Sequence, residues 1–467
     1  SWGNVTGGHK QAKNVITVAN LTSTSLLASS SSRGPSTDGR IKPDISAKGS
    51  SVYSTQEDQT YGTKTGTSMS CPGISGVLAQ LYQAYKELNG GTDPSSALMK
   101  CILLNSADDI GNPGPDFKHG WGQVNSYRAV KMIENNNYFS SSVSQGNINP
   151  FIISVPSGVS KVKVMVYWHD KEANTSASIS LVNDIDIQLI NPAGTTFNPW
   201  VLDPTPNSSN LNQDAVRNFD GLNNMEQVTI DNPSAGNYTL NVEGYAIPYG
   251  PQAFYVTYEF ITDDIELTYP IGGESLVPGE QEYIRWDSYQ SGTLSIEYTV
   301  DGGNNWYTIT NSANSNNQYY SWTVPNYITD DAKIRISSNN SVSSSYSSFT
   351  IIEVPSNLNV YWPCPDSINV NWNSVNGATS YEVSMLGQKY MDSIFTTTNT
   401  NVWIINPNTS VTDSWFSVSS KYNNGKGRRA IAVNAQSINS MCSGYGCTDP
   451  TAYNYSSLAI VNDGSCC

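Results

Sequence analysis

The chain has 467 residues, enough for three to five domains of ordinary size. It carries 24 Lys and Arg residues against 39 Asp and Glu residues, a formal net charge of −15. An acidic chain so poor in basic residues is a poor ligand for nucleic acids and for anionic membranes. No apolar run approaches the roughly 20 residues that a membrane-spanning helix requires. We therefore predict no nucleic-acid partner and no transmembrane segment.

Composition and cysteine usage point to an oxidising compartment. Only 13% of the residues are charged, while Ser, Thr, Asn, Gly and Tyr are abundant, which is typical of secreted β-rich proteins. Four of the seven cysteines lie between Cys442 and Cys467, and this crowding predicts disulfides. Cys71 and Cys101 are interpreted as free thiols in a core. Because seven is odd, at least one cysteine is free or paired between molecules.

The first 140 residues are predicted to form a mixed α/β segment. The β-branched run KNVITVAN, 13–20, predicts a short buried strand. Helices are predicted from Ser68 to about Leu88, over 93–107 and over 124–134. The second of these is expected to begin with Asp93 as its N-cap and Pro94 at its first helical position.

From about residue 145 the helical periodicity ends. Short alternating runs separated by Asn, Gly, Pro and Asp take over, and they predict all-β modules in series. The expected order is an α/β segment at 1–140, β domains at 145–262, 265–352 and 354–440, and a Cys-rich tail at 441–467.

The stretch GTSMSCP places Ser68 at the start of a predicted helix. Free backbone N–H groups and the positive end of the helix dipole lie there, where they stabilise negative charge on a reacting oxygen. Gly66 permits a close approach of backbone or substrate. Gly73 and Gly76 keep the helix thin, as expected for a helix packed inside a domain. The alternative is an ordinary buried helix with a serine cap, because serine caps are common.

Four segments, in order, resemble blocks of the subtilisin-like serine proteases. They are KNVITVAN (13–20), SSSRGPSTDGRIKPDISAKG (30–49), GTSMSCPGISGVLAQL (66–81) and HGWGQVNSYRAV (119–130). The resemblance implies that Ser68 is the catalytic nucleophile and that its backbone N–H is one donor of the oxyanion hole. It also implies that Met69 is the oxidisable methionine beside the nucleophile.

The same resemblance places the catalytic Asp, the catalytic His and the oxyanion-hole Asn before the serine. His9 lies in a loop before the predicted strand, His119 follows Ser68, and His169 lies in the first β module, so none fits as the base. Asn4 lies too close to the predicted strand to be the family's Asn. We therefore expect these three groups on an upstream segment absent from this chain, and negligible activity from Ser68 without it.

The module at 145–262 resembles the jelly-roll β domain that follows the catalytic domain in some bacterial subtilases and, more loosely, the P domain of proprotein convertases. The resemblance implies a structural calcium ion, a cation that prefers clustered oxygens. The candidate ligands are Asp170, Asp184, Asp186 and Glu226. In the alternative interpretation Asp184 and Asp186 are outward residues of an alternating strand, with Ile185 and Ile187 pointing inward.

The later modules also resemble known domains. The segment 265–352 resembles an Ig-like module, 354–440 resembles a fibronectin type III domain, and the tail resembles a short Cys module of secreted bacterial proteins. Three tryptophans of the Ig-like segment, Trp286, Trp306 and Trp322, are expected in the sandwich core and turns, with a carbohydrate platform as the alternative. Cys364 and Cys442 are a candidate disulfide.

The predicted fold class is therefore multidomain, a partial α/β subtilisin-like domain followed by all-β domains and a small disulfide-rich tail. The resemblance implies a secreted subtilisin-like serine endopeptidase that acts by acyl transfer on Ser68. Its expected partners are protein or peptide substrates and the N-terminal part of its own catalytic domain. The alternative is a non-catalytic cell-surface binding or adhesion protein on a degenerate subtilase scaffold. A purely structural string of β modules comes third, because the four motifs occur in order.

Overall fold

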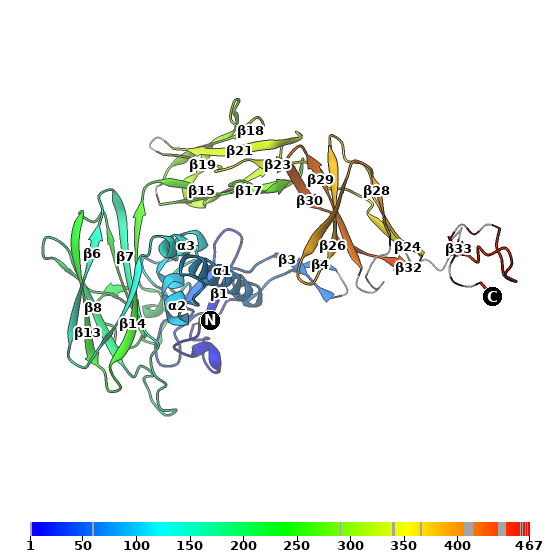
Figure 1. The fold of residues 1–467 in the computed structure, drawn as a ribbon. Coiled ribbons are helices and arrows are strands. Elements are labelled where there is room, and N and C mark those ends of the chain that lie inside the picture. Colours follow the sequence, from blue (N-terminus) through cyan, green and yellow to red (C-terminus); the bar gives the residue numbers. More distant parts are fainter. Residues whose placement is uncertain are drawn as a thin grey trace. The chain divides into compact units, whose positions relative to one another are not determined.

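The computed structural model describes most of the chain (Figure 1). The described residues are 2–57, 60–289, 291–338, 341–364, 367–405, 414–437, 445–457, 459, 461–462, 464 and 466–467. They divide into two compact units, Ser1–Asp263 and Asp264–Cys467.

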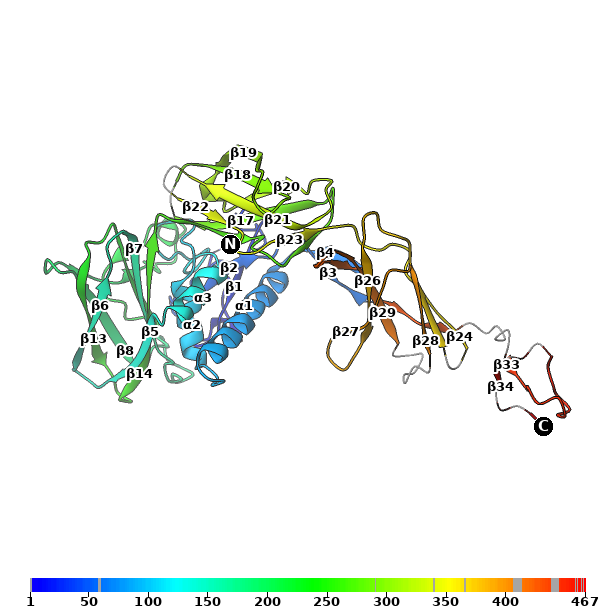
Figure 2. The same ribbon diagram turned by 45° about the horizontal axis from the view of Figure 1, so that its top comes forward.

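The first unit begins with a small α/β layer. Strands β1 (Val18–Leu21) and β2 (Ile45–Lys48) pair in parallel, from Val18 with Ile45 to Leu21 with Lys48. The long helix α1 (Thr67–Leu88) packs on both strands, and α2 (Ser96–Asn105) and α3 (Ser126–Glu134) lie beside it (Figure 2). The three predicted helices are therefore confirmed, and the predicted strand is shorter than expected.

One predicted helix start was wrong. Helix α2 is capped by Ser95, whose hydroxyl accepts a hydrogen bond from the Ala97 N–H at 3.2 Å. Asp93 instead pairs with Lys86 of α1 at 2.9 Å, and Pro94 precedes the helix. Serine and aspartate are equally good N-caps, so the sequence alone did not decide between them.

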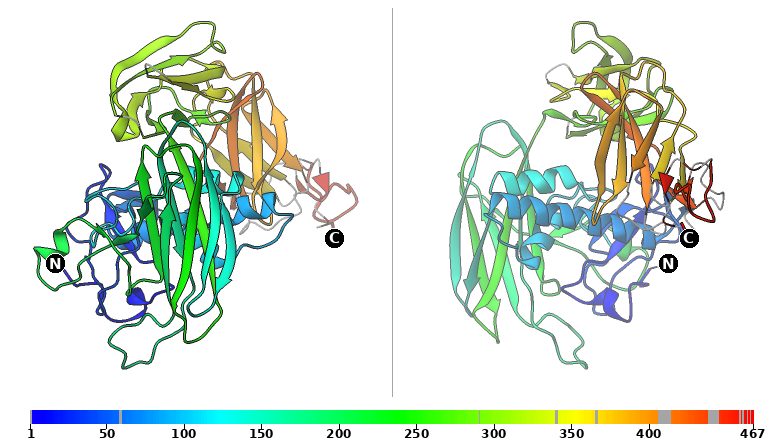
Figure 3. Two further views of the ribbon diagram at one scale, coloured as in Figure 1. Left: turned by 90° about the vertical axis from the view of Figure 1, so that its left-hand side faces the viewer. Right: turned by 45° about the vertical axis from the view of Figure 1, so that its right-hand side comes forward.

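Two four-stranded antiparallel sheets follow and face each other as a β sandwich (Figure 3). One sheet has the order β12 (Met225–Asp231), β7 (Val159–Tyr167), β14 (Gln252–Thr262) and β5 (Tyr138–Val143). The other has the order β6 (Ile148–Val155), β13 (Gly236–Ala246), β8 (Asp184–Ile190) and β9 (Thr196–Phe197).

The sandwich and the α/β layer share buried side chains. Val162, Val164 and Val166 of β7 point into the sandwich core, while Met165 and Tyr167 join the core beneath α2. Helix α2 packs on β7 and β14 accordingly. A strand buried on both faces requires a near-continuous apolar run, and KVKVMVYW supplies one. The packing is thus continuous across the predicted boundary near residue 140.

Short elements complete the first unit. They are the 3-10 turns His9–Gln11 and Asn210–Asn212, the antiparallel pair β3 (Val52–Thr55) and β4 (Tyr61–Lys64), and the antiparallel pair β10 (Trp200–Val201) and β11 (Val216–Arg217).

The second unit holds two further β sandwiches. The first comprises β15 (Ile265–Tyr269), β16 (Ser275–Leu276), β17 (Gln281–Ser288), β18 (Thr293–Thr299), β19 (Tyr307–Asn314), β20 (Tyr319–Thr323), β21 (Thr329–Ser337), β22 (Val342–Ser344) and β23 (Phe349–Ile351), with a 3-10 turn at Ser315–Asn317. The second comprises β24 (Asn359–Cys364), β25 (Ser367–Asn371), β26 (Ser380–Leu386), β27 (Met391–Thr397), β28 (Asn401–Ile405), β29 (Trp415–Tyr422), β30 (Gly425–Arg429), β31 (Val433–Asn434) and β32 (Gln436–Ser437).

The tryptophans of the first of these sandwiches are mainly core residues. Trp286 and Trp322 are buried among Ile284, Ile296 and their neighbours. Trp306 is half-buried, and the Arg335 guanidinium covers its ring at 4.2 Å. The expectation of core and turn positions is therefore confirmed, and three tryptophans do not form an open sugar-binding platform.

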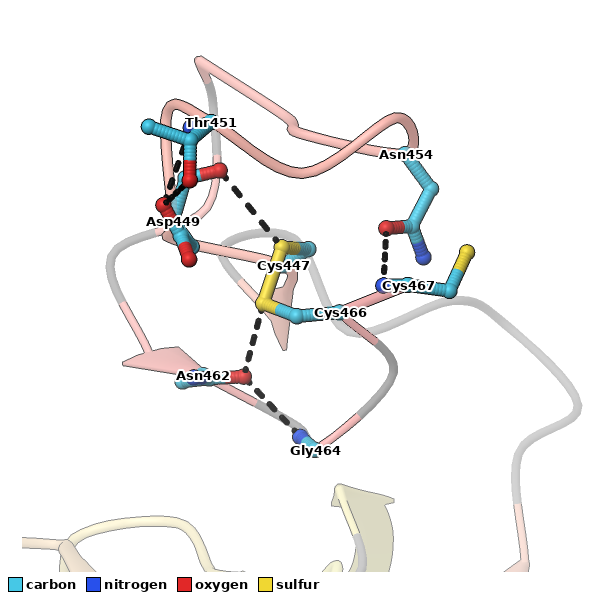
Figure 4. Close-up of a disulfide and its surroundings, with 8 residues drawn as sticks. All are labelled: Cys447, Asp449, Thr451, Asn454, Asn462, Gly464, Cys466 and Cys467. Carbon is cyan, nitrogen blue, oxygen red and sulfur yellow. Dashed lines mark hydrogen bonds between the residues drawn. A yellow bond between two sulfur atoms is a disulfide. The ribbon is translucent and has the colours of Figure 1, made fainter.

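A disulfide between Cys447 and Cys466 closes the part of the tail that the structure describes (Figure 4). Strands β33 (Tyr445–Gly446) and β34 (Val461–Asn462) pair beside it. Of the thiols predicted to be buried, Cys101 is buried but Cys71 is exposed on α1, so that prediction was wrong for Cys71. The candidate pair Cys364 and Cys442 lies outside the residues whose side chains the structure describes.

Candidate active site

Ser68 is the second residue of α1 and is exposed. Gly66 precedes the helix at a φ of 156° and offers no side chain to cap the first N–H groups. Its carbonyl accepts from the N–H groups of Met69 at 2.9 Å and Ser70 at 3.3 Å. Within the described part of the chain, neither the N–H nor the hydroxyl of Ser68 has a hydrogen-bond partner. Both groups are therefore free to act on a ligand.

The start of α1 is fastened to the loop that follows β2. The Gly66 N–H donates to the Gly49 carbonyl at 2.9 Å, and the Ser51 N–H donates to the Thr65 hydroxyl at 2.8 Å. A Cβ added to Gly49 would lie 2.0 Å from the Ser70 hydroxyl oxygen, so only glycine permits this approach. The two contacts set the distance between the strand ends and Ser68.

No histidine reaches Ser68 in the described structure. His119 is buried and its ring binds Asp116 at 3.0 Å, in a loop that bridges to β2. Burial opposes the ionisation of Asp116, but the hydrogen bonds and charge of His119 hold its pKa below the usual value. His169 is exposed and packs edge-on against Tyr167, and His9 lies in an exposed 3-10 turn. The described residues therefore place no imidazole where a base for Ser68 is needed.

Helix α1 has one buried face and one open face. Ser70, Ile74 and Leu81 are buried against the rest of the unit. The opposite face is exposed and consists of small or uncharged residues, namely Thr67, Ser68, Cys71, Pro72, Ser75, Gly76, Ala79 and Gln80. A Cβ added to Gly73 or Gly76 would meet no atom within 4 Å. A helix face that stays in water normally carries charged side chains, so this face has the composition of a packing surface.

Buried ion pairs hold the α/β layer together beneath the site. Asp44 lies directly before β2. Its carboxylate pairs with Lys42 at 2.5 Å and with Lys100 of α2 at 3.2 Å. Burial lowers the pKa of Lys100 to about 8, although the charge of Asp44 opposes that shift. The Thr17 N–H donates to the same carboxylate at 2.7 Å, which ties it to the segment entering β1.

Asp170 joins the α/β layer to the sandwich and is already occupied. Its carboxylate accepts from the Lys13 ammonium at 2.5 Å and from the N–H groups of Val182 and Asn183, each at 2.8 Å. A carboxylate committed to a lysine and two amides is a poor calcium ligand. The structure therefore gives this candidate ligand a different partner.

The other three candidate ligands lie near one another at β8 and β12. Burial, followed by the charges of Asp186 and Asp220, raises the pKa of Asp184 to about 7. Burial and the charge of Glu243 raise the pKa of Asp186 to about 6. Glu226 is fully buried, and its two oxygens accept from the N–H groups of Ile187 and Asp220. Sequence reasoning missed Asp220, because it lies in an irregular loop with no strand pattern.

The fit of this group to calcium is incomplete. One oxygen of Asp184 is buried without a hydrogen-bond partner, which a cation would relieve. In the described residues, however, no three His, Cys, Asp or Glu side chains are placed together as metal ligands. The calcium site therefore stays a prediction, with Asp184 and Asp186 as its best-placed members.

None of the helices in the described ranges combines the length and apolar content needed to cross a bilayer.

Comparison with known proteins agrees with the arrangement around Ser68. The Subtilase family (peptidase S8) matches residues 2–122. The segment that carries β1, β2 and Ser68 is therefore subtilase-like, and the resemblance is confirmed for the first three motifs and for the start of the fourth.

Curated relatives are similar over parts of their length. The Serine protease/ABC transporter B family protein tagA of Dictyostelium discoideum is 24% identical over 263 residues, which are 48% of this chain and 15% of that protein. The C5a peptidase of Streptococcus pyogenes is 37% identical over 83 residues, 17% of this chain and 7% of that protein. The chain thus spans less than a fifth of these relatives.

Solved structures give short partial matches. A lanthipeptide protease is 24% identical, covers 25% of this chain and 41% of its own, and has a TM-score of 0.23. A two-domain fibronectin type III segment of chicken tenascin is 13% identical, covers 37% of this chain and 98% of its own, and has a TM-score of 0.23.

Proposed function

We propose that the chain is the nucleophile-bearing part of a secreted subtilisin-like serine endopeptidase. The observation that carries the proposal is Ser68 at an uncapped helix start, with its hydroxyl and N–H both free in the described structure. A serine nucleophile needs an oxyanion donor as well as a base, and the unpartnered Ser68 N–H is available as that donor. The match of residues 2–122 to the Subtilase family supports the same assignment.

The catalytic domain is completed by a further segment that docks on α1 and on the β1–β2 pair. Parallel sheets normally have several strands and are covered on both faces, whereas the described α/β layer has two parallel strands. The open face of α1, with Gly73 and Gly76, accepts close backbone packing. The docking segment supplies the His that deprotonates Ser68, the Asp that orients it, and an Asn that joins the Ser68 N–H in the oxyanion hole.

In this scheme Ser68 attacks the scissile carbonyl of a peptide substrate while the His takes the hydroxyl proton. The C–N bond then breaks, the His gives that proton to the leaving amine, and the acyl group stays on Ser68 as an acyl-enzyme. The developing oxyanion is held by the Ser68 N–H and by the incoming Asn, and water later releases the acyl group with the same His as base. Gly66 leaves the substrate backbone room to approach the serine. The composition and the disulfide in the tail support an extracellular location.

A fluorophosphonate probe tests the proposal on the natural protein, in its longest or nicked form. We expect labelling of Ser68, found by peptide mapping, and its loss in Ser68→Ala. Ser75→Ala is the matched control, because Ser75 lies two turns further along the same exposed face of α1 and has no part in the proposed mechanism. If the natural protein is folded but the probe does not label it, the endopeptidase proposal is wrong. That result favours the alternative, a non-catalytic binding or adhesion protein on a subtilase scaffold.

The docking segment is tested separately. Gly76→Leu places a bulky side chain on the open face, and we expect it to abolish labelling of Ser68 without unfolding this chain. Glu87→Leu, also exposed on α1 but in its last turn, is the control and should label normally. Normal labelling of Gly76→Leu would show that nothing packs on this face.

We also propose a structural calcium ion near Asp184 and Asp186. The support is the pair of partly buried carboxylates with one oxygen that lacks a partner. Chelation should lower the melting temperature of the first unit, and Asp186→Asn should remove that sensitivity. An unchanged melting curve after chelation argues against the ion.

A further inference from the structure

We propose that Asn20 is a positioning residue for the nucleophile, because its side chain joins the ends of both strands to the first turn of α1. This role rests on the proposed function of Ser68, but its geometry is independent of it. Asn20 lies in β1 and touches neither Ser68 nor a substrate. It acts through Ser70 and Ser50, which flank the nucleophile's turn on two sides.

The Asn20 carboxamide oxygen is the meeting point. It accepts from the Ser70 hydroxyl of α1 at 3.3 Å and from the Ser50 hydroxyl, just after β2, at 3.3 Å. The Asn20 backbone is fixed as well, since its N–H donates to the Ser31 hydroxyl at 3.0 Å and its carbonyl accepts from the Ala28 N–H at 2.9 Å. One side chain thus links β1, the end of β2 and α1.

The Ser70–Asn20 bond of this linkage is buried, whereas the Ser50–Asn20 bond is half-buried. Asn20 and Ser70 are both fully buried. Ser70 also packs closely against Gly49, since a Cβ added to that glycine would lie 2.0 Å from the Ser70 hydroxyl oxygen. Loss of a buried hydrogen bond is unfavourable, because the donor or acceptor that stays behind is left buried without a partner and without water. The Ser70 hydroxyl is therefore held by its hydrogen bond to Asn20, in a place that only a glycine at position 49 leaves open.

The amide nitrogen of Asn20 is buried and has no hydrogen-bond partner among the described residues. A side chain selected only for packing stability would be apolar here, because an unpaired buried donor costs about 1–3 kcal/mol. Retention of an amide at this cost indicates that its acceptor oxygen has a role beyond packing. The role that the geometry offers is the orientation of the turn that carries the Ser68 N–H.

Loss of this acceptor should move the oxyanion donor. The Gly66 carbonyl accepts from both Met69 and Ser70 N–H, so a shift of Ser70 is transmitted to the residues on either side of Ser68. A misplacement of about 1 Å in a catalytic group costs on the order of a hundredfold in rate. We expect Asn20→Ala to slow fluorophosphonate labelling of Ser68 by about tenfold to a hundredfold per folded molecule.

Asn105→Ala is the matched control for a simple loss of stability. Asn105 is also fully buried and also has two side-chain hydrogen bonds, to the Thr257 carbonyl at 3.1 Å and from Gln227 at 2.8 Å. It lies at the end of α2, away from the nucleophile's turn. Both variants should lower the melting temperature, but only Asn20→Ala should slow labelling of the folded fraction.

A double-mutant cycle adds a second readout. Ser50→Ala removes one donor to Asn20, whereas Ser50→Thr keeps the hydroxyl and should label at the wild-type rate. The double variant Asn20→Ala with Ser50→Ala should label no more slowly than Asn20→Ala alone, because the shared interaction has already been lost. Additive slowing would overturn the linkage, and so would a wild-type labelling rate in Asn20→Ala.

If the probe does not label wild-type Ser68, that result overturns the proposed endopeptidase function but not the positioning role of Asn20. Amide hydrogen exchange tests the positioning role independently of labelling. In this chain, Asn20→Ala should speed exchange about tenfold or more in peptides that cover Gly66–Ile74. Asn105→Ala should leave those peptides unchanged. Equal exchange in Asn20→Ala and the wild type would overturn the positioning role.

Discussion

Removal of the Lys13 side chain should strongly destabilise the first unit, because it leaves a buried carboxylate without its counter-ion. The Lys13 ammonium is buried and donates three hydrogen bonds of 2.5 Å, to the Asp170 carboxylate and to the carbonyls of Lys171 and Ser180. These bonds span 157 residues or more of chain and join the α/β layer to the sandwich.

The expected loss of stability depends on the hydrogen bonds that Asp170 retains after Lys13 is removed. Its side chain is fully buried, but the N–H groups of Val182 and Asn183 remain bound to it in Lys13→Ala. Breaking a buried pair by deleting one partner costs about 3–5 kcal/mol. Because two amides still stabilise the charge, we expect the lower end, about 3 kcal/mol. At roughly 2–4 °C per kcal/mol for a unit of this size, the melting temperature should fall by about 6–12 °C.

Urea unfolding of the full chain measures this loss, with hydrogen exchange in peptides of β7 reporting on the first unit alone. Lys10→Ala is the control, because Lys10 is an exposed lysine three residues earlier, and it should change stability by less than about 0.5 kcal/mol. Replacing both partners, Lys13→Met with Asp170→Leu, should recover part of the loss. A loss below about 1 kcal/mol in Lys13→Ala would refute the reasoning, since the pair would then contribute no more than an exposed one.

Three further predictions concern separate regions. Gly76→Ala should stabilise this chain by about 0.5–1 kcal/mol in urea, because an exposed helix-interior glycine is replaced where the new Cβ meets only open space; destabilisation would contradict the open face. Burial opposes the ionisation of Asp38, but hydrogen bonds from Arg40, Ser180 and Ser36 hold its pKa well below the usual value. A lowered folded pKa adds stability that is present above about pH 4 and is lost as the pH falls through the folded pKa, so the melting temperatures of wild type and Asp38→Asn should differ at neutral pH and converge only below about pH 2. Reduction of Cys447–Cys466, which are 19 residues apart, should cost the tail about 3 kcal/mol and expose the segment between them to limited proteolysis, with the first unit unaffected. Cleavage that needs no reductant would contradict this.

The sequence predicts features that depend on neighbouring residues, such as helix α1, but not features that depend on residues distant in the sequence. The helix that begins at Thr67 was predicted because glycine, serine and an apolar period follow one another within a few residues. The predicted start of α2 is wrong: Ser95 caps the helix, while Asp93 pairs with Lys86 of α1, and the sequence alone does not choose between two equally good caps. Three-dimensional neighbours decide such cases, and the sequence pattern does not contain them.

Asp170 illustrates the same limit at the candidate metal site. An acidic residue just after an apolar strand resembles a calcium ligand, yet the partner of Asp170 is Lys13, which lies far away in the sequence. Asp220 was missed for the converse reason, because it approaches Glu226 only through the fold of an irregular loop. Asn20 was hidden inside a run chosen as a strand, where an amide is unusual in a buried position.

One face of the α/β layer is covered by the β sandwich, and the other face is exposed. On one side α2 lies against β7 and β14, and residues such as Met165 and Tyr167 complete a shared core, so this side is closed. On the other side α1 presents glycine, serine and alanine where a helix in water would carry Lys or Glu. Glycine inside a helix costs about 0.5–1 kcal/mol relative to alanine, and two exposed glycines offset that cost only if something packs closely against them. Among the described residues, the open face of α1 that begins at Ser68 is therefore the docking face for the segment that we propose completes the triad.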